Sequence, residues 1–190
     1  LVSYLHIFRS FRDEALVQME RVAAERGQRE QAIFVLAQDN HAVLKKALAE
    51  RLQAWSEKDP DPLFDSLFAR LPDGTIRNNP QGFDGTTMPG VFVPRGVTVD
   101  ADFRRRLVAA YDVVAQYGPA FHVRFTNTGV MLPEGVLVGY WPEGATWFQD
   151  VEAAFSLVEL EYFTGAQPDL DGHGRHPAGR GWPPRRDDLP

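Results

Sequence analysis

The sequence predicts an α+β protein in which a long amino-terminal helix supports an antiparallel sheet. Three observations carry this prediction. Residues 2–55 contain no proline and repeat apolar residues at three- and four-residue steps, which is typical of a helix. After Gly118-Pro119 the apolar period changes from 3.6 to 2, which indicates a strand. A second short apolar run, residues 136–141, is bounded by Gly135 and Pro142.

The long helix carries two apolar seams separated by the polar stretch AERGQREQ, residues 24–31, with Gly27 near its centre. We expect a bend or a change of helix face there. A continuous helix of this length would extend about 80 Å at 1.5 Å per residue, too long for a lone globular helix. We therefore expect it to pack against a second copy of the chain, against the membrane-proximal part of its own domain, or against both. The seams are Phe8, Phe11, Ala15, Met19 and Val22, then Ile33, Leu36, Ala37, Val43, Leu44, Ala47, Leu48, Leu52 and Trp55.

The stretch SEKDPDP, residues 56–62, ends the long helix, because two prolines forbid its continuation. A short helix is predicted over residues 63–68. Short strands follow at residues 75–77 and 91–93, joined by a loop rich in glycine and proline. Loops of this kind often carry binding residues.

The central block predicts a helix over residues 102–117 that starts at Asp100 or Asp102 and ends at Gly118-Pro119. In residues 121–126, Phe, Val and Phe alternate with His, Arg and Thr, which predicts a half-buried strand. With the strand at 136–141 it would form an antiparallel pair, buried beneath the preceding helix.

Beyond this block, residues 147–162 fit a helical face formed by Trp147, Val151, Phe155, Val158 and Tyr162. Residues after Gly165 are dominated by glycine and proline and predict an irregular tail. The expected organisation is a helical stalk over residues 1–57, an α+β lobe over 58–165 and the tail over 166–190.

Composition limits the function classes. A chain of 190 residues with 44% hydrophobic content can bury one substantial core. The net charge of −6 and the lack of basic clusters argue against a nucleic-acid partner. There is no cysteine, which excludes disulfides, thiolate nucleophiles and cysteine metal sites.

The opening LVSYLHIF, followed by Arg9 and Arg12, has two readings. It is too short to cross a bilayer, which needs about 20 residues. It fits the interface end of a transmembrane helix, and equally the start of an ordinary amphipathic helix. On the first reading the chain is a fragment of a membrane-anchored protein.

Motifs of catalysis and metal binding are weak. PDLDGHG, residues 168–174, has the start of a calcium loop without its later ligands. His173 and His176 lack a third ligand. No phosphate-binding glycine loop and no G-x-S-x-G nucleophile elbow is present. We therefore predict no catalytic residue, no metal and no cofactor.

A ligand-binding pocket needs an apolar body with a few directed polar groups. The central block supplies such residue types, either as pocket lining or as ordinary core and surface residues. The predicted ligand-binding residues are Tyr117, His122, Arg124, Tyr140 and Trp141.

Four runs carry a resemblance to a known family: RLPDGTIRNNPQGFDGT, VFVPRGVTVDADFRRRLVAAYDVVAQYGPAFHVRFTNT, LPEGVLVGYWPEGATWFQD and LVELEYFTGAQP. Together with the long helix they resemble the extracytoplasmic double Cache, or PAS-like, sensor region of bacterial transmembrane histidine kinases, over residues 28–168. The resemblance implies a periplasmic, membrane-anchored sensor domain, dimeric through the helix, that passes a signal to a cytoplasmic kinase.

The resemblance carries no catalytic residue, because the family's conserved chemistry lies in the kinase part. The amino-acid-binding motif of some relatives is not recognisable, so an amino-acid ligand is not expected. After EYFTGAQP the family continues with strands of a second lobe, whereas this chain reads HPAGRGWPPRRDDLP. Truncation or a reading-frame error would explain that difference.

We therefore expect a non-enzymatic sensing domain of a two-component receptor, with an unknown small molecule or periplasmic protein as its partner. The same sensor could serve a diguanylate cyclase or a chemoreceptor. A small soluble enzyme would require His122, Arg124 and Tyr140 to converge on one point. A structural stalk protein would have a sheet without a pocket.

Overall fold

The computed structural model describes residues 2–159, without the side chains of residues 2–11, 13 and 159. The chain divides into two compact units, Leu1–Lys46 and Ala47–Pro190. Each unit is described below by itself. The predicted tail, residues 166–190, and Tyr162 of the predicted last helix lie outside the described residues.

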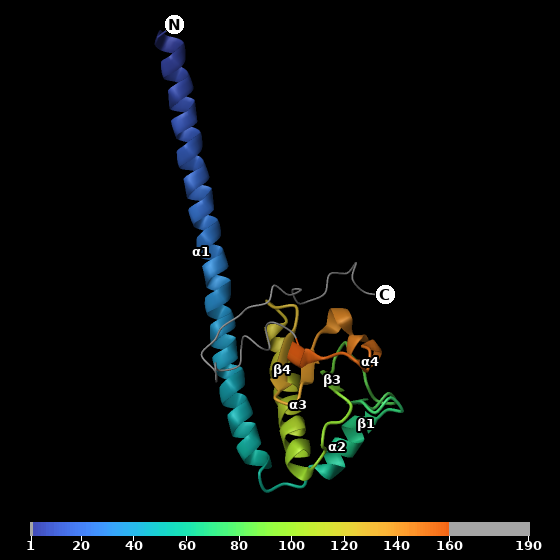
Figure 1. Ribbon diagram of the computed structural model, residues 1–190. Helices are drawn as coiled ribbons and strands as arrows, with labels where there is room; N and C mark the ends of the chain where they lie inside the picture. The colour runs from blue at the N-terminus through green and yellow to red at the C-terminus, as the bar shows by residue number, and fades with distance from the viewer. Residues whose placement is uncertain (1, 160–190) are drawn as a thin grey trace, which may run out of the picture. The chain divides into compact units, whose positions relative to one another are not determined.

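The long helix is confirmed as α1 (Val2–Trp55), which has 54 residues (Figure 1). Helical structure continues through Gly27, so the polar stretch does not break the helix. Two ion pairs, each between residues four positions apart, stabilise that stretch of the helix. Arg21 Nε lies 3.1 Å from Glu25 Oε1, and Arg26 Nε lies 3.1 Å from Glu30 Oε1. Such exposed pairs each add about 0.3–0.5 kcal/mol to helix stability. Between residues 2 and 159, no helix is both long enough and apolar enough to cross a membrane.

The second unit is built on a five-stranded antiparallel sheet, which confirms the predicted α+β class. Its strand order is β1-β2-β3-β5-β4. The strands are β1 (Phe68–Arg70), β2 (Ile76–Asn78), β3 (Gly90–Val93), β4 (Thr128–Leu132) and β5 (Val136–Tyr140). The helix α2 (Asp61–Leu67) precedes β1, and α3 (Ala101–Phe121) joins β3 to β4. The strand β1 was not predicted from the sequence.

One face of the sheet packs against α3. Apolar positions of α3 at helical spacing meet alternate residues of the strands, and α2 closes the end of the layer. Leu48 and Trp55, from the last turns of α1, pack against the same core. Its buried members are Phe64, Phe68, Ile76, Val91, Val93, Phe103, Leu107, Val108, Ala110, Tyr111, Val114, Leu132, Val136, Val138 and Tyr140.

The helix α3 begins as predicted and ends later than predicted. The Asp100 side chain accepts a hydrogen bond from Phe103 N at 2.8 Å, which is an N-cap. Gly118-Pro119 does not end the helix, because Pro119 lies in the last turn and His122 N still donates to Gly118 O at 2.9 Å.

The predicted strand at residues 121–126 is therefore wrong. Phe121 completes the helix, with its ring centroid 5.8 Å from that of Tyr117 one turn earlier. Val123 is 77% exposed, so the alternation of apolar residues does not reflect a buried face. The strand begins later, at Thr128.

The opposite face of the sheet is covered by residues 141–159, which we call the covering segment. It contains two 3-10 turns, η1 (Pro142–Gly144) and η2 (Leu157–Glu159), and the four-residue helix α4 (Trp147–Asp150). Phe148 and Leu157 are buried against Phe92 and Leu137 of the sheet. The single helix predicted from residue 147 is wrong, because α4 ends at Asp150 and the chain turns.

The turn between β4 and β5 is tied to α3 by a two-pronged ion pair. Arg106 donates from Nη1 to Glu134 Oε2 at 3.1 Å and from Nη2 to Glu134 Oε1 at 2.6 Å. Arg106 Nε also donates to Asp102 Oδ2 at 2.9 Å. The hydrogen bonds from Arg106 lower the pKa of Glu134, and the bond to Glu134 raises the pKa of Arg106.

We predict that Gly118→Ala destabilises the second unit. A methyl group at Gly118 would lie 2.5 Å from Tyr140 Cβ, so the helix or the strand must move. Overpacking of this kind costs about 1–3 kcal/mol, measured as the free energy of unfolding in urea. The control is Gly82→Ala, where a methyl group meets nothing within 4 Å. Equal stability of the two variants would contradict the close packing of α3 on β5.

We predict that Glu134→Gln reduces stability at pH 7 by about 1 kcal/mol, because a charge-assisted pair is lost. The folded-state pKa of Glu134 is lowered. Its stabilising contribution is therefore present above the unfolded pKa of about 4.3 and lost as the pH falls through the lower folded pKa. The gap between wild type and variant should thus shrink in urea unfolding between pH 7 and pH 3. A gap that stays constant would count against the prediction. The exposed Glu152→Gln is the matched control.

Candidate functional site

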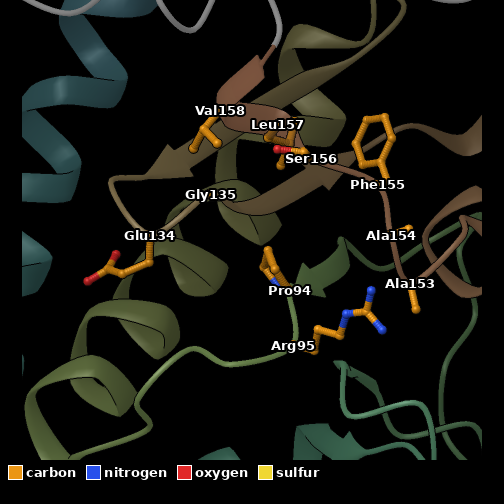
Figure 2. Close-up of a pocket in the computed structure, with 10 residues that line it drawn as sticks. All are labelled: Pro94, Arg95, Glu134, Gly135, Ala153, Ala154, Phe155, Ser156, Leu157 and Val158. Carbon is orange, nitrogen blue, oxygen red and sulfur yellow. The ribbon is translucent and has the colours of Figure 1, made fainter.

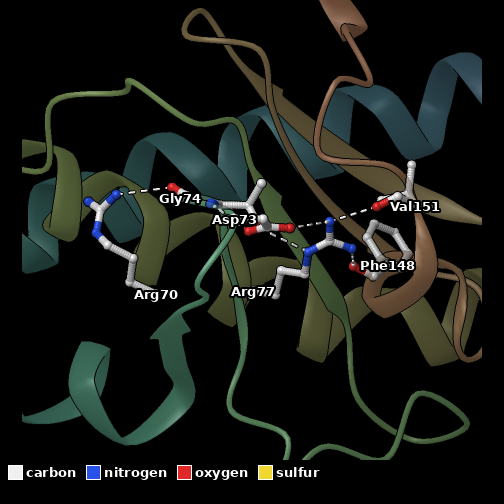
Figure 3. A network of polar contacts seen from close by, with 7 residues as sticks. Arg70, Asp73, Gly74, Arg77, Phe148 and Val151 are labelled. Carbon is white, nitrogen blue, oxygen red and sulfur yellow. Dashed lines mark hydrogen bonds and ion pairs between the residues drawn. The ribbon is translucent and has the colours of Figure 1, made fainter.

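An arginine is buried in the sheet. Arg77, in the middle of β2, is 2% exposed. Its guanidinium donates from Nε to Thr75 Oγ1 at 3.1 Å, from Nη1 to Phe148 O at 2.9 Å and from Nη2 to Val151 O at 2.6 Å (Figure 3). Two of its three acceptors are thus main-chain carbonyls of the covering segment.

The three hydrogen bonds of the Arg77 guanidinium are all made to neutral oxygen atoms. Asp73 Oδ2 lies 3.7 Å from Arg77 Nη2, and Asp73 itself is 40% exposed. Hydrogen bonds from Thr75, together with the nearby Arg77, lower the pKa of Asp73. Burial lowers the pKa of Arg77, against the opposing influence of Asp73 and Asp150. Removing this buried charged side chain, or replacing it with a shorter one, is therefore expected to lower the free energy of unfolding.

The turn between β1 and β2 places these groups. Gly74 has φ +86° and its N donates to Leu71 O at 2.9 Å, a backbone conformation that favours glycine. Asp73 Oδ1 accepts from Thr75 N at 2.9 Å and from Thr75 Oγ1 at 2.7 Å. This local turn therefore orients Thr75 and Asp73, two and four residues before Arg77, toward its guanidinium.

Three glycines lie side by side on the same face of the sheet. Gly139 of β5 is the register partner of both Gly90 of β3 and Gly129 of β4. A methyl group at Gly90 would lie 2.1 Å from Phe148 Cδ2, and one at Gly139 would lie 2.7 Å from Phe148 Cζ. The Phe148 ring thus rests on bare backbone. Gly129, on the edge strand, is exposed. We call these three residues the glycine row.

Aromatic rings surround Phe148. Its ring packs edge-on against Trp147, with centroids 5.0 Å apart. Trp147 also packs against Phe155 at 5.5 Å, and Phe155 lies 6.0 Å from Phe92. The Arg77 guanidinium lies 5.1 Å from the centroid of Phe92. The aromatic rings and the Arg77 cation thus pack together on this face of the sheet, with the guanidinium bound to Thr75 and to two carbonyls of the covering segment.

The structure brings two of the five predicted ligand-binding residues together. His122 Nε2 lies 2.8 Å from Glu143 Oε1, and the His122 ring packs edge-on against Tyr140. Tyr140 donates its hydroxyl to Thr86 O at 3.2 Å. This pair lies where the end of α3 meets the end of β5, so the structure brings His122 and Tyr140 together.

The other three predicted residues lie apart from that pair. Trp141 packs with the covering segment on the opposite face of the sheet from Tyr140. Arg124 is exposed in the turn after α3. Tyr117 is half-buried on α3 against Phe121.

A small pocket of about 200 Å³ lies where the covering segment passes the β4–β5 turn (Figure 2). Figure 2 shows the Glu134 carboxylate and the Arg95 guanidinium at opposite ends of it. Ligand pockets usually measure about 300–1,000 Å³. The pocket is lined by Pro94, Arg95, Glu134, Gly135 and residues 153–158. Within residues 2–159, no group of three or more His, Asp or Glu side chains could hold a metal ion.

Sequence reasoning did not find Arg77 or the glycine row. One signal was present in the sequence: glycine in the interior of a strand often marks close approach by a ligand or another chain segment. Gly139 interrupts an apolar run in this way, and Gly129 stands directly before one. Arg77 gave no such signal, because a charged residue in a short strand usually faces solvent.

We predict that Arg77→Lys destabilises the second unit almost as much as Arg77→Gln, by about 3 kcal/mol. A lysine ammonium cannot reproduce the fork that reaches Phe148 O and Val151 O together. Urea unfolding measures the loss. Arg95→Gln, an exposed arginine nearby, is the control and should change stability by less than about 0.5 kcal/mol. If Arg77→Lys has the same free energy of unfolding as wild type, the paired hydrogen bonds to Phe148 O and Val151 O are not needed for stability.

Comparisons of the chain with protein-family models, with curated proteins and with solved structures give no match.

Proposed function

We propose that this chain is the extracytoplasmic sensing domain of a membrane-bound sensor histidine kinase of the double Cache, or PAS-like, class. The resemblance of residues 28–168 to that family supports the proposal. The architecture agrees with it: a long helix leads into an antiparallel sheet with a second helix on one face.

The observation that carries the proposal is the attachment of the end of α1 to the sheet's helical layer. Within the second unit, Leu48 and Trp55 pack against the core. Arg51 donates from Nη1 to Asp112 Oδ2 at 3.4 Å and from Nη2 to Gln116 Oε1 at 3.0 Å, both on α3. A change in the sheet that moves α3 would therefore act directly on α1.

The first unit offers a surface for a second copy of the chain. Large apolar side chains on this part of α1 are exposed, among them Met19 at 68%, Val22 at 58% and Ile33 at 56%. These three share one helix face by their spacing. A single helix with exposed apolar side chains is stable when another helix covers them. We propose a parallel pair of α1 helices, with both amino-terminal ends directed to the inner membrane.

The proposed mechanism is a population shift. Ligand or partner binding at the sheet favours one of two arrangements of the paired helices, and the kinase beyond the membrane follows. The free energy available for signalling equals the ligand's difference in affinity for the two arrangements.

Other functions receive less support. A soluble enzyme built on His122, Arg124 and Tyr140 needs the three side chains to meet. However, His122 and Tyr140 pair with separate groups, and Arg124 is exposed. A diguanylate cyclase or chemoreceptor output would use the same sensor. Autophosphorylation of the full gene product from ATP would distinguish a kinase from both.

The chain's lack of cysteine allows a direct test with single-cysteine variants. We predict that Val22→Cys and Ile33→Cys each form a disulfide-linked dimer with themselves under mild oxidation, because a parallel pair places equal positions together. In intact cells that make the full gene product, with any cysteine outside this chain replaced by serine, a membrane-impermeant maleimide should label both cysteines. Glu20→Cys and Gln31→Cys, on the opposite face by helical spacing, are the controls and should not crosslink.

Three results would overturn the proposal. Crosslinking only between Val22→Cys and Ile33→Cys would indicate an antiparallel pair, which cannot place both helices in one membrane. Absence of any crosslink would exclude the helix dimer. Labelling only after cell lysis would place the domain in the cytoplasm.

A further inference from the structure

We propose that the pocket between the covering segment and the β4–β5 turn binds a short aliphatic monocarboxylate. The carboxylate pairs with Arg95, and the hydrocarbon chain extends toward Glu134. The inference rests on the proposed sensor function for its biological meaning, and it names the chemical class of the ligand. The binding itself is measured independently of that function.

Three segments that are distant in sequence form the walls of this pocket (Figure 2). Pro94 and Arg95 follow β3, and Glu134 and Gly135 lie in the β4–β5 turn. Residues 153–158 of the covering segment form the third wall. The pocket therefore exists only because the covering segment passes over this end of the sheet.

The body of the pocket is apolar. A methyl group at Gly135 would lie 3.3 Å from Val158 Cγ1 and 3.8 Å from Pro94 Cγ, so these three residues converge and close one side. The volume of about 200 Å³ is below the range of about 300–1,000 Å³ that holds drug-sized ligands. The ligand is therefore a small molecule with a short hydrocarbon chain. The apolar lining residues are Pro94, Ala153, Ala154, Phe155, Leu157 and Val158.

Arg95 supplies an uncompensated positive charge. Its side chain is exposed, and among residues 2–159 its guanidinium makes no hydrogen bond and no ion pair. Hydrogen bonds from Thr75 lower the pKa of Asp73 most, and the charge of Arg95 adds the smallest contribution, so Asp73 and Arg95 interact only weakly. A guanidinium with unused donors forms a two-pronged pair with a carboxylate. Arg95 therefore selects an anionic ligand.

The opposite end of the pocket is negative. Figure 2 shows the Glu134 carboxylate at the far end from the Arg95 guanidinium. Arg106 binds both oxygens of Glu134 and also donates to Asp102, so two carboxylates share one guanidinium. The hydrogen bonds from Arg106 lower the pKa of Glu134, which keeps this side chain ionised at neutral pH. A second carboxylate on the ligand would meet like charge here. The pocket is therefore specific for monocarboxylates over dicarboxylates.

The pocket is also connected to the long helix through printed contacts of one residue after another. Glu134 lines the pocket and binds Arg106 on α3. Further along α3, Asp112 and Gln116 accept hydrogen bonds from Arg51 of α1. A ligand that shifts the β4–β5 turn would therefore act on α3 and, through Arg51, on α1.

Isothermal titration calorimetry on the full 190-residue chain tests the proposal with three compounds that have the same number of carbon atoms. Sodium pentanoate should bind. Pentanamide should bind at least about 10-fold more weakly, because it lacks the charge that pairs with Arg95. Glutarate should also bind at least about 10-fold more weakly, because its second carboxylate meets Glu134.

Two variants separate the pocket from the rest of the surface. Arg95→Gln should weaken pentanoate binding at least about 10-fold, whereas the matched control Arg124→Gln, an exposed arginine outside the pocket, should bind like wild type. Ala153→Leu fills part of the pocket while Arg95 is kept, and it should also weaken binding. Circular dichroism checks that each variant is folded. If Ala153→Leu does not fold, Ala154→Leu, at an exposed lining position, is titrated in its place.

The proposal is overturned if pentanoate does not bind, if the acid and its amide bind equally, or if glutarate binds as tightly as pentanoate. Equal effects of Arg95→Gln and Arg124→Gln would also overturn it, because binding would then be general attraction to the surface. Crosslinking of α1 without pentanoate binding would leave the proposed receptor standing and remove only this site. Pentanoate binding without crosslinking would retain the site and remove the paired-helix receptor.

Discussion

The buried guanidinium of Arg77 is the constraint on which the second face of the sheet depends. A charge at 2% exposure requires acceptors at its donors. Among residues 2–159, the β1–β2 turn and the covering segment supply them. Segments that are 71 and 74 residues away from Arg77 in sequence are thereby held on β2. The covering segment has little regular secondary structure of its own, so this contact and the aromatic packing determine its position.

The two faces of the sheet are consequently built on different principles. On one face, regular helices bury alternate strand residues in an apolar layer. On the other, an irregular segment is held by one cation, a row of glycines and a few aromatic rings. Regular helical layers are cooperative, whereas irregular segments open locally at lower free energy. A sensor needs one rigid face to transmit a change and one adaptable face to receive it. In the proposed receptor, the contacts of Arg51 on α1 with Asp112 and Gln116 on α3 belong to the regular helical face.

Much of the fold was predictable because its signals are local. The absence of proline before residue 60 predicted α1, and Asp100 predicted the start of α3. The strand β5 was predicted because Gly135 and Pro142 bound an apolar run. The failures arose where a local signal competed with packing. Gly118 reads as a helix end, yet it is buried in α3 because Tyr140 leaves no room for a side chain. Residues 147–162 read as one helix, yet Val151 O is bound by Arg77 and the helix ends.

The candidate site, too, could not be predicted from local sequence signals. The predicted residues were selected by type within one stretch of sequence, and the sheet then separated them: neighbouring Tyr140 and Trp141 lie on opposite faces. Phe148, Arg77 and Gly139 are far apart in sequence, and only strand register and the path of the covering segment bring them together.

The sequence by itself determined the α+β class, the long amino-terminal helix and the positions of β2, β3 and β5, because periodicity, caps and breakers act over a few residues. Only the tertiary structure decided which arginine is buried and which glycines lie side by side. Those properties depend on long-range pairing between strands. The free energy of burying the Arg77 charge depends on hydrogen-bond acceptors 71 and 74 residues away, which no local sequence pattern specifies.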